Sequence, residues 1–135
     1  MIMKRAILLY VLLLVVHAFH VLEEVVGRAY FIDSFYGGLH NFLIVMIVLL
    51  IIPLFLLYWI IKKNKIAMYL AFFYPVVMMI DGLDHIVEVF IIGKYIAGAA
   101  GLITGLAFLP IGIVLILQLK RTLPRTKKCE PKLNF

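Results

Sequence analysis

Residues 39–61 read LHNFLIVMIVLLIIPLFLLYWII, a run without a single Asp, Glu, Lys or Arg. About 20 apolar residues in a helix cross a hydrocarbon core of about 30 Å. Lipid offers the backbone no hydrogen-bond partners, so a spanning segment of this kind must pair its own polar groups as a helix. The run therefore predicts a transmembrane helix, with Tyr58 and Trp59 near the membrane interface.

Three further apolar stretches occupy residues 6–26, 66–93 and 98–119. Hydrophobic residues make up 66% of the 135-residue chain and charged residues only 15%, which is typical of a membrane protein rather than a soluble domain. Few residues remain outside the four stretches. The sequence predicts an all-α, integral membrane bundle of four transmembrane helices over residues 1–119, followed by a basic cytoplasmic tail over residues 120–135.

Two of these stretches need a further argument. The first contains no small-x-small cleavage site after its apolar run, so we expect a retained helix rather than a cleaved signal peptide. The stretch at 66–93 would be roughly 42 Å long as a straight helix. Because that length exceeds the hydrocarbon core, the helix should tilt, protrude, or kink at Pro75 or Gly82.

The basic residues indicate the orientation. Of the 13 Lys and Arg residues, all but Arg28 and Lys94 precede the first span, separate the second from the third, or lie in the tail. These segments share one side of a four-span topology, so the positive-inside rule places both termini in the cytoplasm. Basic residues that flank spans argue against nucleic acid as a partner. We expect a multi-pass protein of a prokaryotic plasma membrane, in contact with lipids, as a homodimer or a subunit of a membrane complex.

Ionisable side chains gather inside the spans, where they are costly and point to function. Spacings of three and four residues place those of each helix on one face. Counted from the cytoplasmic flanks, the groups of three spans fall in one layer of the outer half of the bilayer, and Thr104 of the fourth span lies at a similar depth. The groups are His17, His20, Glu23 and Glu24 in the first span, His40 in the second, and Asp81, Asp84, His85 and Glu88 in the third.

Five of these groups are carboxylates, which cannot all stay ionised in a low-dielectric layer without compensation. Arg28 and Lys94 are too few to neutralise them, whereas a divalent metal would compensate several. Histidine and carboxylate together suit zinc, iron or manganese. The candidate metal ligands are His20, Glu24, Asp81, Asp84, His85 and Glu88, with His17, Glu23 and His40 as further candidates. Glu23 can instead snorkel toward the headgroups, and His40 can be an interfacial hydrogen-bonder.

The segment His20-Val21-Leu22-Glu23-Glu24 resembles the HXXEE family of small multi-span membrane proteins, which takes its name from this motif. The resemblance implies that His20, Glu23 and Glu24 are important, and it implies no activity. Carboxylate-bridged dimetal bundles use Glu-x-x-His pairs. Here the order is His-x-x-Glu and the fourth span offers no ligand, which argues against a symmetrical dimetal site.

Three functions remain open. The first is a metal-binding membrane protein, or a metalloenzyme acting on a membrane-soluble substrate, in which metal would activate water or oxygen. The second is a proton or cation relay, and the third is a structural subunit whose polar layer fixes helix packing. In each, the first and third spans should be neighbours with Glu24 facing His85. His40 should cap the cluster, and the Gly101–Gly105 face should close the bundle.

Overall fold

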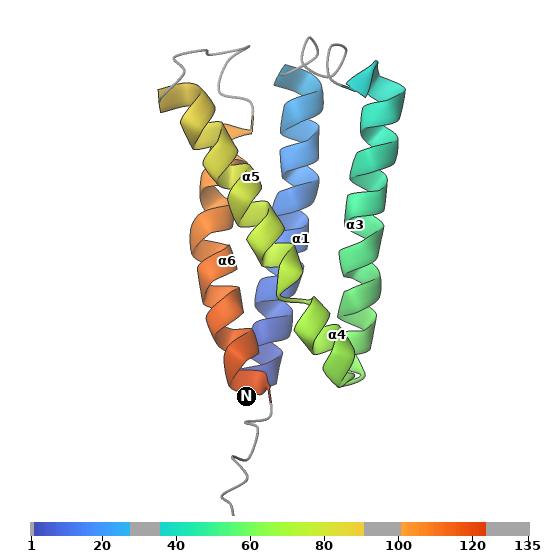
Figure 1. The fold of residues 1–135 in the computed structure, drawn as a ribbon, viewed down its shortest axis with the longest axis vertical. Coiled ribbons are helices and arrows are strands. Elements are labelled where there is room, and N and C mark those ends of the chain that lie inside the picture. Colours follow the sequence, from blue (N-terminus) through green and yellow to red (C-terminus); the bar gives the residue numbers. More distant parts are fainter. Residues whose placement is uncertain (1, 28–35, 91–100, 124–135) are drawn as a thin grey trace, which may run out of the picture.

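The computed structural model describes residues 2–27, 36–90 and 101–123, and every regular element in these ranges is a helix. The helices run up and down in a bundle (Figure 1). In chain order they are α1 (Ile2–Gly27), α3 (Leu39–Ile61), α4 (Lys65–Leu70), α5 (Phe73–Phe90) and α6 (Leu102–Thr122).

Within the described ranges, four helical stretches are long and apolar enough to cross a membrane, namely Met3–Gly27, Leu39–Ile61, Lys65–Val87 and Leu102–Thr122. Large apolar side chains cover the outside of the bundle, as expected for a surface that faces lipid rather than water. The all-helical architecture with four candidate spans is therefore confirmed. The second stretch has the predicted bounds, and the last continues three residues beyond the predicted end at Leu119.

The third candidate span is broken into α4 and α5 at Ala71–Phe72 (Figure 1). Pro75 lies four residues beyond Ala71. A proline ring clashes with the carbonyl four residues earlier and cannot donate to it, so the helix breaks at this carbonyl. The kink is thus one of the two predicted at Pro75 or Gly82, and helix α5 continues through Gly82.

Helix α6 makes the most extensive contacts, packing against both α5 and α1. It approaches α5 closely where Gly82 meets Gly105: a Cβ atom on Gly82 would lie 2.3 Å from the Gly105 carbonyl oxygen. Helix α3 packs on α1 and α4 at the side of the bundle (Figure 1). This arrangement sets α1 between α3 and α6, and it leaves the polar face of α5 turned toward that of α1.

The larger apolar core fills the half of the bundle that contains the N-terminus, and it includes Tyr10, Leu13, Met78, Phe108 and Leu115. A smaller apolar cluster joins Val21 of α1 to Phe42 of α3. The buried polar residues of α1 and α5 lie next to these two cores. The protein therefore buries a polar layer inside an otherwise apolar bundle.

Candidate metal centre

Three side chains from two helices converge in this layer. His20 of α1, and Asp81 and His85 of α5, each offer one ligand atom, and these atoms all lie within 4.8 Å of one another. Asp81 and His85 are one helical turn apart, so both point from the same side of α5. We call these three residues the His/Asp cluster. It is a buried group that could hold a metal ion, and it joins two of the predicted spans.

Two separations within the cluster are close to those around a metal. Nε2 of His20 lies 3.1 Å from Oδ2 of Asp81 and 3.3 Å from Nε2 of His85. Two donor atoms that each lie about 2.0–2.2 Å from a tetrahedral zinc ion are about 3.3–3.6 Å apart. The two distances from His20 therefore suit an ion shared with Asp81 and His85.

One oxygen of the cluster is left without a hydrogen bond. Oδ2 of Asp81 is buried and has no hydrogen-bond partner, although Nε2 of His20 is only 3.1 Å away. The approach is close enough for a hydrogen bond but does not have its geometry. A buried, unpaired carboxylate oxygen costs free energy. A metal ion between the imidazole and the carboxylate would satisfy both.

Glu24 lies beside the cluster, and its two oxygens reach different histidines. Oε2 is 3.8 Å from Nε2 of His20, and Oε1 is 3.8 Å from Nε2 of His85. The side chain is buried. The predicted meeting of Glu24 and His85 is thus present in the structure. At this distance Glu24 can become a fourth ligand after a small movement, or remain as a base beside the ion.

A glycine backbone covers the two imidazoles. Gly101, just before α6, has a φ of +81°, and a Cβ atom there would lie 2.6 Å from Cε1 of His85 and 3.0 Å from Cε1 of His20. One turn later, a Cβ on Gly105 would be 3.1 Å from Cδ2 of His85. Both positions require the absence of a side chain. The predicted closing role of the Gly101–Gly105 face is therefore confirmed.

A small cavity opens on the other side of the cluster, between α1, α3 and α5. Its volume is about 80 Å³, which is more than a single water molecule needs. Polar groups of the cluster form part of its lining, and the Asp81 side chain is 39% exposed. The remaining lining is apolar and comes from α3 and α5, through Met46, Leu49, Val77 and Met78. The cluster is thus enclosed by α6 and accessible from the α3–α5 side.

His17 lies one turn before His20 and also lines the cavity. Its Nδ1 is 3.1 Å from the hydroxyl of Tyr74, and its ring packs edge-on against Phe108. His17 does not belong to the group within ligand distance. Together with Tyr74, His17 forms a polar part of the cavity lining.

Two other predicted ligands, Asp84 and His40, are not brought into the cluster. Asp84 is exposed, because it lies on the flank of α5 opposite to His85. His40 is exposed in the first turn of α3, so the prediction that it caps the cluster is not borne out; α3 buries Phe42 instead. The Glu88 side chain lies outside the part of the chain that is described.

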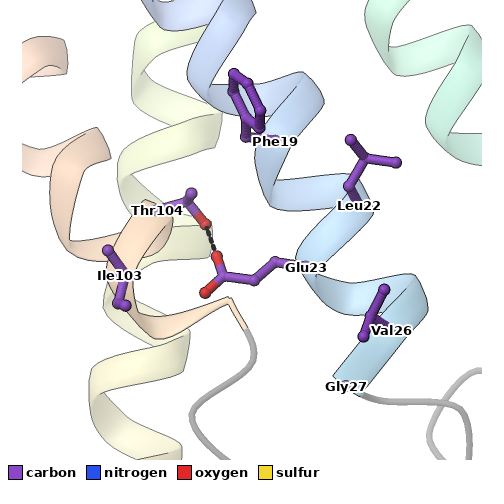
Figure 2. A pocket seen from close by; sticks show the side chains of 7 residues that line it. All are labelled: Phe19, Leu22, Glu23, Val26, Gly27, Ile103 and Thr104. Atoms are coloured by element: carbon purple, nitrogen blue, oxygen red, sulfur yellow. Dashed lines mark hydrogen bonds between the residues drawn. The ribbon is translucent and has the colours of Figure 1, made fainter.

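Two residues of the layer have partners that spacing alone did not identify. The Thr104 hydroxyl lies 2.8 Å from Nδ1 of His20 and donates a 2.6 Å hydrogen bond to Oε2 of Glu23 (Figure 2). The only sequence signal for Thr104 is its depth, which matches that of the histidines. Glu23 turns toward α6 instead of toward the cluster.

Comparisons of the chain with protein-family models, curated proteins and solved structures gave no match. The functional argument therefore depends on the geometry of the cluster.

Proposed function

We propose that this chain is an integral membrane protein that holds a divalent metal ion with His20, Asp81 and His85. The observation that carries the proposal is the convergence of three ligand atoms within 4.8 Å around a buried, unpaired Asp81 oxygen. Four apolar helices of spanning length support the membrane location. The likeness to the HXXEE family at residues 20–24 remains part of the proposal and rests on the motif alone.

The ligand set indicates a reactive site more than a closed structural one. Two histidines and one carboxylate occur in hydrolytic zinc sites and in non-haem iron(II) oxygenases, both of which keep open positions on the metal. In this protein His20 and Asp81 line the 80 Å³ cavity, which would leave room for a further ligand beside an ion that they held. We therefore propose a metalloenzyme using zinc, iron or manganese, in which the metal polarises a bound water or substrate.

The apolar walls favour a substrate dissolved in the membrane. Met46 and Leu49 of α3 face Val77 and Met78 of α5 across the cavity, so a molecule entering there passes between hydrocarbon side chains. Glu24 lies 3.8 Å from both histidines, within reach of a proton on a group bound at the metal. Glu24 is our candidate for the general base.

A proton or cation relay finds less support. Between the cluster and the basic end, the described core is apolar apart from His17, Tyr74 and Tyr10. A transmembrane relay needs a continuous polar path.

Metal analysis of the purified protein tests the proposal. Wild type should contain a divalent metal, measured by plasma mass spectrometry, and should rebind Zn²⁺, Fe²⁺ or Mn²⁺ after stripping with a chelator. His20→Ala and His85→Ala should lose the metal. His40→Ala is the matched control, because His40 is exposed, and it should retain wild-type metal content.

Two results would contradict the proposal. One is wild-type protein that neither contains nor rebinds metal. The other is equal metal content in His20→Ala and His40→Ala. Thermal unfolding in detergent, followed in parallel, shows whether each variant is folded. If wild type contains no metal and His20→Ala is less stable than wild type, the polar layer is structural.

A further inference from the structure

A chain of hydrogen bonds leads away from the cluster through α6. Nδ1 of His20 is 2.8 Å from the Thr104 hydroxyl, which is 2.6 Å from Oε2 of Glu23. The Thr104 and Glu23 side chains point toward each other across the α1–α6 interface (Figure 2). The imidazole of His20 is buried. Its Nε2 lies in the His/Asp cluster, and its Nδ1 lies next to the Thr104 hydroxyl.

The direction of these hydrogen bonds follows from the number of protons. A threonine hydroxyl has a single proton and can donate only once. Thr104 gives that proton to Oε2 of Glu23. The Thr104 oxygen must therefore accept from His20, whose proton lies on Nδ1. In the neutral ring, Nε2 then carries a lone pair.

We propose that Glu23 and Thr104 are positioning residues, which hold His20 with its proton on Nδ1 and its Nε2 lone pair aimed into the cluster. The proposal rests on the metal site proposed above. Carboxylates that act on the second nitrogen of a metal-binding histidine fix its tautomer and orientation and raise its basicity. Here the carboxylate acts through one intervening hydroxyl.

The proposal assigns different roles to two adjacent acids. Successive helical residues differ by about 100° in direction, so Glu24 enters the cluster while Glu23 faces α6. Glu23 and Thr104 line a groove of about 560 Å³ between α1 and α6, whose other walls are apolar: Phe19, Leu22, Val26, Gly27 and Ile103 (Figure 2).

Substitutions of Thr104 test this assignment with two measurements, Zn²⁺ affinity and the histidine ¹⁵N chemical shifts of metal-free protein. Thr104→Val keeps the shape but removes the hydroxyl, and it should weaken Zn²⁺ binding by about 10–100-fold and move the His20 proton from Nδ1 toward Nε2. Thr104→Ser keeps the hydroxyl and should restore both. Glu23→Gln should weaken binding while leaving the protein folded.

The matched control is Thr122→Val, because the Thr122 hydroxyl donates a 2.7 Å hydrogen bond to a backbone carbonyl at the other end of α6. It should leave Zn²⁺ affinity unchanged. Wild-type affinity and an unchanged His20 tautomer in Thr104→Val would overturn the positioning role, while metal loss in His20→Ala would leave the site itself standing. If wild type binds no metal, the proposed function fails. The positioning role is tested separately: a His20 ring protonated on Nε2 in the spectrum of the metal-free protein would overturn it.

Discussion

Asp81 and Asp84 show how a helix separates residues that are close in sequence. A step of three residues turns back by about 60°, and a step of four advances by about 40°. Asp84 and His85 therefore lie on opposite flanks of the face centred near Asp81. Because α5 turns the His85 flank toward α1, Asp81 joins the cluster and Asp84 is exposed.

This pair gives a matched test at the residue scale. Loss of a residue that only positions a ligand weakens metal binding by roughly 10–100-fold. Asp81→Asn should lower Zn²⁺ affinity by more than this, because it replaces a ligand with an amide, which binds the metal poorly. Asp84→Asn should change it by less than about twofold, because surface substitutions away from a site have small effects. Competition with a chromophoric chelator measures both. Equal affinities in the two variants would remove Asp81 from the ligand set.

The sequence predicted a buried cluster of histidines and carboxylates and several of its residues, and the structure contains a cluster of this kind that could hold a metal. His20, Glu24, Asp81 and His85 were predicted from helical spacing and depth, and the structure brings them together. Spacing defines a face only to within about 100°, and it carries no information on helix rotation. That is why Asp84 and His40 were included, and why the partnership of Thr104 with Glu23 was not predicted.

At the scale of the helices, α5 and α6 cross closely at glycines. A Cβ on Gly82 would meet the Gly105 backbone oxygen at 2.3 Å, whereas one on Gly112 would meet the flexible Met79 side chain at 2.6–2.8 Å. Backbone cannot move aside without separating the helices, but a methionine side chain can adopt another rotamer. The two glycines should therefore differ in their tolerance of a methyl group.

We expect Gly82→Ala to destabilise the bundle by about 1–3 kcal/mol, the usual cost of overpacking. Gly112→Ala should cost less, and the gain in helix propensity can offset part of it. Unfolding by denaturant in detergent micelles measures both. A variant Gly82→Ala that is as stable as wild type would show that the helices separate there without cost.

Helix positions were the most predictable level of the structure. Long apolar runs define spans because lipid leaves the backbone no alternative to a helix, and the bounds at 39–61 agree with α3. The break between α4 and α5 was expected only as a kink near Pro75 or Gly82. A proline acts on the carbonyl four residues before it, which places the break at Ala71.

At the scale of the whole molecule, the basic residues of the described ranges lie at one end of the bundle. All Lys and Arg residues in the described ranges lie in the first turn or two of α1, in the turn from α3 to α4, or in the last turn of α6. These segments meet at the same end of the bundle (Figure 1). His20 lies 15 residues beyond Arg5, or about 22 Å along the helix. The polar layer thus lies well away from the basic end.

We therefore predict that the basic end faces the cytoplasm. With Cys129 replaced by serine, a cysteine at Asn64 should react with an impermeant maleimide only after the cells are opened. A cysteine at Asp33 or Tyr95 should react in intact cells, and tags at both termini should be cytoplasmic. Reaction at Asn64 in intact cells would reverse the orientation.

The closure of the cluster by Gly101 and Thr104 has a consequence for biosynthesis. A ribosome delivers α1 first and α6 last, so His20 and Glu24 leave the ribosome long before the residues that cover and orient them. During that interval the polar faces of α1 and α5 need shelter from hydrocarbon, where each acid costs roughly 2.5–3.5 kcal/mol. In the membrane protein with a metal site proposed above, the insertion machinery would supply that shelter, and the metal would be delivered after translation is complete.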